Sequence, residues 1–431
     1  MAVPLPIVKR SFAGKLERFE GRGRGAGSFD LPVLKILVSS AHPNMKQRTV
    51  IGGTILLTCL AASSLATAQI MISGNEAKIE LTSGGQVVLR DAPADTLTLL
   101  DFATFPPKAT TIDAVANTVI GPPSNIDITP DGSLALIADS LKINTADPTK
   151  TIPHNAIHLL DLRANPPKII GQITVGQQPS GLSITPDGRL ALVANRAGGT
   201  VSVLKIAGKN VTHLREVKVC EPLESASDVA ISPDGTRALV SIQKAGLLVE
   251  LKIDGENVVL AGRKYSVYGQ PYRVVITPDG KLGVTSGMGM STNGVDSDAV
   301  SVVDLASNPP RAIQHFTTGS SPESLELSPD GKLLAVVTME GSNLAPTNPN
   351  ITTAGGLYLY RRTKNGFEFS QQLKTGRIPE GVAFTSDGKY LVVQCHPERE
   401  LRIYRVSGGT VKDTGERVKV PGMPSSLRAA R

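Results

Sequence analysis

The stretch GLSITPDGRLALVAN, residues 181–195, decides the fold of this chain. Leu182 and Ile184 alternate with other residues before Pro-Asp-Gly, and Leu190 and Leu192 alternate after it, which is the two-residue period of a β-strand. Asp-Gly is a strong hairpin signal because the turn needs positive φ, which glycine adopts freely and aspartate tolerates. The stretch therefore predicts two short antiparallel strands joined by a tight turn.

Five further copies of this phrase occur along the chain. They end on Pro-Asp-Gly or Ser-Asp-Gly and read NIDITPDG (125–132), DVAISPDG (228–235), RVVITPDG (273–280), SLELSPDG (324–331) and GVAFTSDG (381–388). Successive turn aspartates are 56, 47, 45, 51 and 57 residues apart. A repeat of about 40–50 residues with four strands each is typical of propeller blades.

A second set of hairpins counts the blades independently. Seven outer hairpins are expected, at 99–109, 159–169, 203–211, 250–258, 302–312, 359–367 and 403–411. Seven outer hairpins against six Asp-Gly turns indicate that one blade is split between the two ends of the propeller and lacks one turn. We expect 421–430 to supply the inner strand of that blade, and 85–92 and 96–102 to supply its other strands. The prediction is an all-β, seven-bladed β-propeller with four antiparallel strands per blade, closed by a blade that is split between the N- and C-terminal parts of the chain.

The segment MKQRTVIGGTILLTCLAASSLATAQ (45–69) has the order of a secretory signal peptide. Two cations precede a short apolar run, and the segment closes on Ala-Thr-Ala, an A-x-A cleavage site. We predict that translation starts at Met45, that residues 1–44 are an over-extended start, and that cleavage occurs before Gln69. An uncleaved membrane anchor is the alternative, although the apolar run is short for a span of roughly 20 residues; lipidation at Cys59 is a weaker one. Residues 69–89 are then a lead-in, and 90–431 form the propeller.

Without the predicted signal peptide and the residues before it, the net charge of the chain is close to zero. The whole chain has a net charge of +7, but residues 1–68 hold nine Lys/Arg and three Asp/Glu, which leaves 36 cations and 35 anions. With no Trp and 4% aromatic residues, the chain also lacks a rich supply of base-stacking side chains. We therefore expect no nucleic-acid partner, no membrane span after cleavage, a periplasmic or secreted location, and a monomer.

The repeated phrase resembles the YVTN-type β-propellers, exported seven-bladed proteins of bacteria and archaea. The resemblance covers roughly residues 90–431, and the Tyr-Val-Thr-Asn tetrad appears in altered form, as in Leu192-Val193-Ala194-Asn195. It implies the propeller fold and leaves function open, because the family contains binding, surface-layer and unassigned members and is similar to lactonase-type and quinoprotein or cytochrome-type propellers. The absence of Trp argues against a WD-repeat propeller.

The loops between second and third strands share one face of such a ring. Three are predicted to be long, at 139–156, 286–300 and 339–356, whereas 195–199 and 395–400 are tight. Long loops held by a rigid scaffold often carry function. Drift of the repeat at a tolerant surface is the alternative explanation.

Charged side chains follow the Gly/Pro lead-ins and begin the tight loops on this face. We predict a ring of ligand-binding residues around the mouth of the central channel: Arg196, Glu221, Glu224, Arg273, Glu323, Glu380 and His396. Carboxylates beside arginines could hold a small polar ligand or act as a general base beside an electrophilic clamp. The alternative is that these groups pair only with one another.

The sequence contains few other motifs that indicate metal binding or catalysis. His154 and His158 have a spacing seen in zinc sites, and Asp296 and Asp298 offer carboxylates to calcium without the spacing of an EF-hand. The chain has no phosphate-binding glycine loop, CxxCH haem motif or GxSxG elbow. Cys220 and Cys395 fall about three blades apart, so we expect no disulfide between them.

Two functions are consistent with these observations. The first is a binding module that takes a small polar ligand or a protein partner on its loop-rich face, with no cofactor. The second is a lactonase-like hydrolase that uses the acidic and basic residues at the channel mouth, and a divalent metal would then be possible. Fold analogy alone supports the second.

Overall fold

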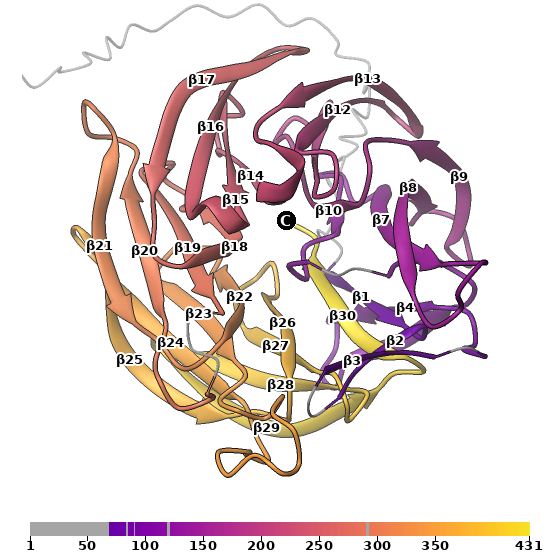
Figure 1. Cartoon of the computed structure of the whole chain (residues 1–431), viewed down its shortest axis with the longest axis vertical. Coiled ribbons are helices and arrows are strands. Elements are labelled where there is room, and N and C mark those ends of the chain that lie inside the picture. Colours follow the sequence, from indigo (N-terminus) through magenta and orange to yellow (C-terminus); the bar gives the residue numbers. More distant parts are fainter. Residues whose placement is uncertain (1–68, 83–84, 90, 119–120, 290–292) are drawn as a thin grey trace, which may run out of the picture. The chain divides into compact units, whose positions relative to one another are not determined.

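Seven four-stranded antiparallel sheets form the blades of a β-propeller in the computed structural model (Figure 1). The structure describes residues 69–431 except 83–84, 90, 119–120 and 290–292. The expected over-extended start (1–44) and signal peptide (45–68) lie outside the described residues. None of the helices in the described part of the chain is long and apolar enough to cross a membrane.

Six blades are each made of four consecutive strands. Blade 1 comprises β6 (Ile126–Ile128), β7 (Leu134–Ile143), β8 (Thr151–Asp161) and β9 (Lys168–Thr174), and blade 2 comprises β10 (Pro179–Ile184), β11 (Leu190–Asn195), β12 (Thr200–Ala207) and β13 (Asn210–Lys218). Blade 3 comprises β14 (Ala226–Ile231), β15 (Arg237–Ile242), β16 (Leu247–Asp254) and β17 (Asn257–Ser266). Blade 4 comprises β18 (Gln270–Ile276), β19 (Leu282–Met288), β20 (Ala299–Asp304) and β21 (Arg311–Thr317). Blade 5 comprises β22 (Pro322–Leu327), β23 (Leu333–Thr338), β24 (Gly356–Thr363) and β25 (Gly366–Lys374), and blade 6 comprises β26 (Pro379–Phe384), β27 (Tyr390–Cys395), β28 (Glu400–Ser407) and β29 (Thr410–Lys419). Two 3-10 turns complete this part, η1 (Pro222–Glu224) and η2 (Gln243–Ala245).

The seventh blade is split between the two ends of the propeller, as the hairpin count predicts. Its strand order is β30 (Met423–Ala429), β1 (Ile70–Glu76), β4 (Thr96–Asp101) and β5 (Lys108–Ile112). β30 pairs antiparallel with β1, from Met71 opposite Ala429 to Glu76 opposite Met423. The first strands of successive blades contact one another from β6 round to β30 and back to β6. The ring is therefore closed by the last strand of the chain.

Two expectations about the chain near this blade were wrong. Residues 85–92 supply no strand to it; β3 (Gly85–Val88) pairs with β2 (Ile79–Thr82) in a separate hairpin. The second strand of the blade is β1, within the segment expected to be a lead-in, because its residues Met71 and Ile72 are completely buried against the neighbouring blades. The propeller begins at Ile70.

The loop expected at 139–156 is mostly strand. β7 continues to Ile143 and β8 begins at Thr151, so the two form a long hairpin with a turn at its tip. The other two expected loops are present: 289–298 joins β19 to β20 and is shorter than the expected 286–300, and 339–355 joins β23 to β24.

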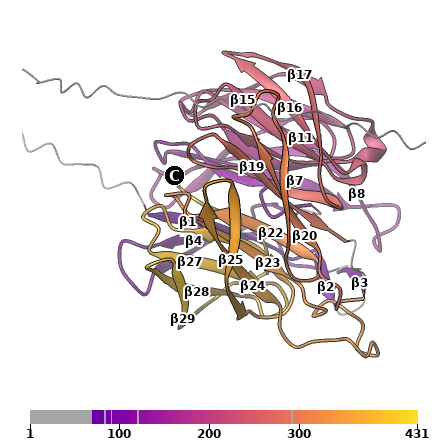
Figure 2. The same cartoon turned by 90° about the vertical axis from the view of Figure 1, so that its left-hand side faces the viewer.

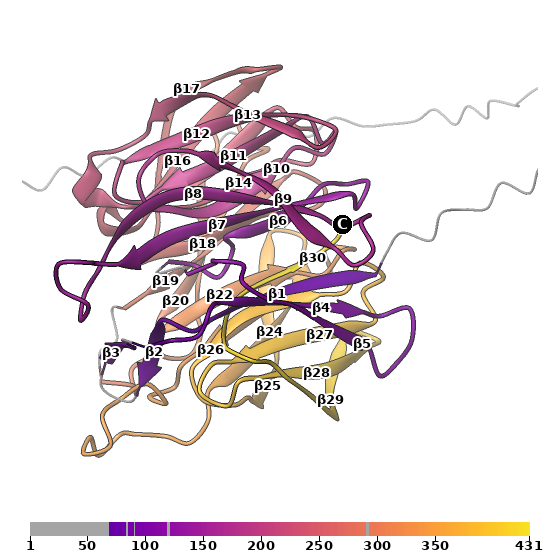
Figure 3. The ribbon, with the colours of Figure 1, turned by 90° about the vertical axis from the view of Figure 1, so that its right-hand side faces the viewer.

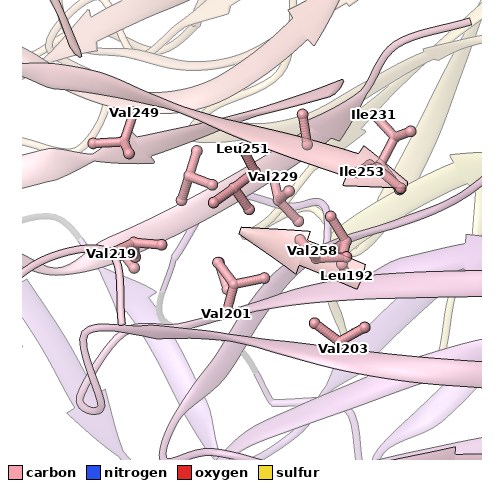
Figure 4. Packing of buried hydrophobic residues seen from close by; sticks show 14 of the residues in the cluster. Leu192, Val201, Val203, Val219, Val229, Ile231, Val249, Leu251, Ile253 and Val258 are labelled. Carbon is pink, nitrogen blue, oxygen red and sulfur yellow. The ribbon is translucent and has the colours of Figure 1, made fainter. Parts of the chain in front are cut away.

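Buried apolar side chains of the described residues fall into seven clusters, each between two neighbouring blades. Figure 4 shows the cluster between blades 2 and 3, where Leu192, Val201 and Val203 face Val229 and Leu251. Alternation along each strand produces this packing, because every second side chain points to the same face of the sheet. The outer strands of blades 5 and 6, β25 and β29, are in contact at the outside of the ring (Figure 2).

The central channel has two different ends. Chain direction places the lead-ins and the second-to-third loops at one end, which we call the loop end, and the Asp-Gly turns at the other, which we call the turn end. Figure 3 shows the β2–β3 hairpin on the side where β7 turns into β8, with the C-terminus toward the opposite side.

Candidate functional site

In four blades, the residue directly before the innermost strand has a positive φ, in the left-handed region. Gln178, Ser225, Ser321 and Ile378 have φ of 57°, 60°, 53° and 43°, and each lies directly before an inner strand. A positive φ is a true outlier for a β-branched residue such as Ile378, and such strain concentrates where function constrains the chain. The sharp turn places the second residue of each inner strand at the loop end of the channel.

Five side chains converge there, from blades 2, 4, 5, 6 and 7. We call them the loop-end cluster: Glu76, Arg196, Tyr272, Glu323 and Glu380. Glu323 and Glu380 are only 3% and 4% exposed, and Glu76 is 2% exposed. The electrostatic interactions run from Arg196 and Tyr272 to Glu323, and from Glu380 to both Glu323 and Glu76.

Arg196 does not form an ion pair with these carboxyls. Its Nη1 donates to Ser227 Oγ at 2.6 Å and its Nη2 to Gln243 Oε1 at 2.6 Å, both neutral groups. The guanidinium also lies 5.8 Å from the centre of the Tyr272 ring. In the described residues no salt bridge links Arg196 to Glu323 or Glu380, so the expected alternative of mutual pairing does not describe this cluster.

Each carboxyl of the cluster keeps a buried oxygen without a hydrogen-bond partner in the described structure. These atoms are Glu76 Oε2, Glu323 Oε2 and Glu380 Oε1. Burial raises the pKa of Glu323 to about 8, although Arg196 and a hydrogen bond with Tyr272 act in the opposite direction. Burial, followed by the charges of Glu323 and Glu76, raises the pKa of Glu380 well above its usual value. At neutral pH the pair is therefore held largely as neutral carboxylic acids, which donate as well as accept hydrogen bonds.

Arg273 belongs to the other end of the channel, contrary to the expectation that it would join Glu323 and Glu380. Counting back from the Asp-Gly turns shows why: Glu323 and Glu380 match Tyr272, one residue before Arg273. A shift of one residue reverses the direction of a strand side chain. Arg273 Nη2 forms an ion pair with Glu326 instead.

A second polar group forms the turn-end cluster: Asp127, Asp228, Arg273, Glu326 and Arg428. Arg428 Nε donates to Asp127 Oδ1 at 2.6 Å, and its Nη1 lies 3.7 Å from Glu326 Oε2. Ser124 Oγ donates to Asp228 Oδ1 at 2.8 Å, which joins blade 1 to blade 3 past the inner strand of blade 2. The two ends of the channel therefore have separate polar groups.

The other predicted ligand-binding residues contact nearby loop residues and lie apart from the loop-end cluster. Glu221 is exposed and pairs with Lys218 at 2.6 Å, while Glu224 accepts the backbone N–H of Glu221 at 2.8 Å in the cap of η1. His396 is completely buried, and its Nε2 accepts the N–H of Leu81 from the β2–β3 hairpin at 3.0 Å. Burial lowers the pKa of His396 to about 4, which keeps the ring neutral. These three residues anchor loops, and they do not join Glu323 and Glu380.

The remaining sequence signals also have local roles. His154 Nδ1 lies 2.8 Å from Asp139 Oδ2, and the described residues contain no group of three or more His, Cys, Asp or Glu that could hold a metal ion. Asp298 is buried and accepts the N–H of Ser321 at 2.9 Å, whereas Asp296 accepts a bond from Asn293 at 2.7 Å within its own turn. Cys220 and Cys395 are both free thiols, as expected.

Sequence reasoning missed six residues of the two clusters: Glu76, Tyr272, Asp127, Asp228, Glu326 and Arg428. Strict alignment on the Asp-Gly turns would have found four of them. It places Tyr272 at the position of the two loop-end glutamates, Asp228 at the position of Arg273, and Asp127 and Glu326 at one shared position three residues after the glutamates. Arg428 has no turn after it, but it lies four residues after the lead-in Pro424, as Glu326 does after Pro322. No repeat signal identifies Glu76, which lies in the part of the split blade that has no Asp-Gly turn.

Comparisons with known proteins agree with the propeller fold and do not identify an activity. No protein-family model matches the chain, and no curated protein sequence matches it significantly. Among solved structures, a functionally unknown protein from Desulfotomaculum acetoxidans is 14% identical, with a TM-score of 0.62 over 84% of this chain and 99% of that one. A candidate 6-phosphogluconolactonase from Bacteroides fragilis is 17% identical, with a TM-score of 0.62 over 86% and 99%. The periplasmic gluconolactonase of Pseudomonas aeruginosa is 18% identical, with a TM-score of 0.58 over 84% and 99%.

Proposed function

We propose that this propeller binds a small polyhydroxy molecule at the loop-end cluster. The observation that carries the proposal is the state of Glu323 and Glu380, which are buried, come from adjacent blades, and each keep an oxygen without a partner. A buried polar group without a hydrogen bond costs roughly 1–3 kcal/mol, so such groups in a native protein call for an explanation. A ligand that supplies the missing bonds is one explanation.

The protonation of the cluster favours hydroxyl groups as its partners. A neutral carboxylic acid donates one hydrogen bond and accepts others, and a hydroxyl does the same. Tyr272 adds a phenolic hydroxyl, and the Arg196 guanidinium adds positive charge for a carbonyl or carboxylate on the same ligand. A sugar acid or sugar lactone has these groups, and two of the structural neighbours bear lactonase names.

Calorimetric titration with gluconate and with glucono-1,5-lactone tests the proposal. Saturable binding that weakens at least tenfold in the variant Glu323→Gln/Glu380→Gln is expected, because the amide cannot reproduce a carboxyl that both donates and accepts through oxygen. Glu221→Gln is the matched control, since it changes an exposed glutamate of the same face that pairs only with Lys218. Equal loss in the control, or unchanged affinity in the double variant, would contradict the assignment.

A second candidate is hydrolysis of a lactone at the same cluster. The specific observation in its favour is the pKa of Glu323, raised to about 8 by burial, which suits a general acid near neutral pH. Water would add to the lactone carbonyl carbon and lose a proton to solvent. The ring C–O bond would break as Glu323 protonates the leaving oxygen, with Arg196 stabilising the charge on the carbonyl oxygen.

Turnover separates the two candidates. In a pH-stat assay, a hydrolase would consume base in proportion to protein, with a rate that falls as pH rises through about 8 and that is lost in Glu323→Gln. A binding module would leave the lactone to its uncatalysed hydrolysis rate while still binding gluconate. The proposal favours the second outcome, because the cluster has general-acid candidates without an activated nucleophile.

We also propose that the protein is an exported member of the YVTN-type propellers. Support comes from the leader at 45–68, with its A-x-A ending, and from the periplasmic gluconolactonase among the structural neighbours. N-terminal sequencing of the protein from its native host is expected to read from Gln69. Recovery of residues 1–44 on the exported protein would contradict this proposal.

A further inference from the structure

A cavity of about 500 Å³ opens at the turn end of the channel. This volume lies in the range of about 300–1,000 Å³ that small-molecule sites occupy. It is lined by residues from the inner strands of all seven blades, including the turn-end cluster, and does not include the loop-end cluster. It is therefore a separate candidate site, which the proposed function does not use.

The acidic groups of this cavity are already satisfied. Asp127 Oδ1 accepts from Arg428, and its Oδ2 accepts the N–H of Ile184 at 2.8 Å in the next blade. Asp228 Oδ1 and Oδ2 accept from Ser124 at 2.8 Å and from the N–H of Val274 at 2.9 Å. Glu326 Oε1 accepts the N–H of Leu327 at 3.1 Å, and Oε2 accepts from Arg273. All six carboxyl oxygens thus have a protein partner, and none needs a ligand.

One donor is left over. The side chain of Arg273 is 1% exposed and lines the cavity, and its Nη1 has no hydrogen-bond partner in the described structure. A guanidinium cannot lose its proton, so this N–H remains a charged donor. Arg428 and Arg431 also line the cavity and add positive charge. The polar end of the cavity therefore holds one charged N–H donor that lacks an acceptor in the described structure.

The rest of the wall is apolar. Prolines of five successive turns and isoleucines of four inner strands line it: Pro130, Pro186, Pro233, Pro278, Pro329, Ile128, Ile184, Ile231 and Ile276. Ala230, Val275 and Ala383 also line the cavity. An apolar wall with few polar groups at one end fits a molecule with an apolar body and one charged head.

We propose that the turn-end cavity binds a small apolar carboxylate, with the carboxylate on Arg273 Nη1 and the hydrocarbon body along the proline and isoleucine wall. A sugar acid fits this cavity poorly, because its hydroxyls would face apolar side chains and lose their bonds to water. A cation has no free acceptor among the six carboxyl oxygens. The site thus differs from the loop-end cluster in the chemistry of its ligand, and either could exist without the other.

Titration of the full chain with a series of straight-chain carboxylates tests this inference. Acetate, butyrate, hexanoate and octanoate are expected to bind with affinity that rises about three- to fourfold per methylene, until the cavity is full. Octanol, which lacks the charge, is expected to bind at least tenfold more weakly than octanoate. Benzoate tests whether an aromatic body fits as well, and gluconate should not compete with octanoate.

Two variants locate the site. Arg273→Gln/Glu326→Gln removes both members of the ion pair, so that no buried charge is left alone, and should weaken octanoate at least tenfold. Ala230→Leu keeps the ion pair and shortens the cavity, so it should weaken octanoate more than butyrate. Arg189→Gln is the control, since Arg189 is an exposed arginine on the same face, 3.9 Å from Asp187. The gluconate titration of the proposed function should be unchanged in all three.

Several outcomes would overturn the inference. Absence of octanoate binding at millimolar concentration would do so, as would equal binding of octanol, or an affinity that does not rise with chain length. Unchanged octanoate binding in both Arg273→Gln/Glu326→Gln and Ala230→Leu would place any binding elsewhere. None of these results bears on gluconate binding at the loop end, so the two proposals can fail independently.

Discussion

The two ends of the channel are built from the same seven inner strands and treat charge in opposite ways. At the turn end, Arg273 and Arg428 neutralise Glu326 and Asp127 through direct ion pairs. At the loop end, Arg196 bonds to neutral groups, and Glu323 and Glu380 remain without a counterion in contact. The positions differ by only a few residues along each strand, yet every carboxyl oxygen of the turn-end cluster has a protein partner, whereas each loop-end carboxyl keeps one oxygen without a partner in the described structure.

The difference shows how a repeat separates stability from function. Asp127 and Asp228 accept backbone N–H groups of the next blade, so the turn-end carboxyls fasten neighbouring blades together. Each loop-end carboxyl keeps one oxygen that no group in the described structure satisfies, although Glu323 also hydrogen-bonds with Tyr272. Buried unpaired carboxyls reduce stability, and proteins retain such groups mostly at functional sites.

Deleting residues 421–431 should have the largest effect, because it damages both ends at once. The deletion removes β30, which closes the ring through its pairing with β1, and it removes Arg428 from Asp127. We expect loss of cooperative thermal unfolding and of near-UV circular dichroism. A truncated protein that still melts in one sharp transition would show that the ring does not depend on this strand.

Arg428→Gln should destabilise the turn end strongly. It leaves Asp127, which is 2% exposed, without its counterion, and removing one partner of a buried pair costs roughly 3–5 kcal/mol. Despite burial, which acts to raise it, the pKa of Asp127 is lowered by Arg428, so the stability from this pair is present above the ordinary aspartate range and is lost as pH falls through the folded pKa. Chemical denaturation at pH 7 and at pH 3 should therefore show a large difference from the wild type at pH 7 and a smaller one at pH 3.

Glu380→Gln should have a smaller effect of the opposite sign. The folded pKa of Glu380 is raised above its unfolded value by burial and by Glu323 and Glu76. Its contribution to stability is therefore fully present below the unfolded pKa and declines as pH rises toward the folded pKa. The variant should match the wild type near pH 4 and be more stable at pH 9, by on the order of 1–3 kcal/mol. Destabilisation at pH 9 would show that the glutamate has a partner at this end after all.

Sequence reasoning reached the architecture because the signals for it are local. An Asp-Gly turn needs no distant partner to be recognised, and six such turns with seven outer hairpins were enough to predict seven blades and the role of 421–430. β1 was missed because its partners, β30 and β4, are remote or unmarked by a turn. The long hairpin at 139–156 was read as a loop because its polar residues, such as Asp139 and His154, satisfy each other only after folding.

The sites were predicted only in part, for the same reason. Arg196, Glu323 and Glu380 were found at the channel, whereas Arg273 was assigned to the wrong end by a shift of one residue. Which charges pair depends on contacts between blades that no local pattern records: Arg196 was expected among carboxylates and contacts Ser227 and Gln243 instead. Glu221, Glu224 and His396 have the right residue types in positions where the fold uses them to hold loops.

The protonation state of the loop-end carboxyls tests the central claim most directly. Infrared difference spectra between the wild type and Glu380→Gln at pH 7 report whether a protonated carboxylic acid is lost on substitution. We predict that the wild type shows the carbonyl band of protonated acids at pH 7, and that Glu380→Gln weakens this band while Glu221→Gln leaves it unchanged. The reason is that burial and the neighbouring carboxyls hold the pKa of Glu380 far above its usual value. A spectrum showing only ionised carboxylates at pH 7 would mean that a counterion occupies the loop end, and the contrast between the two ends would not hold.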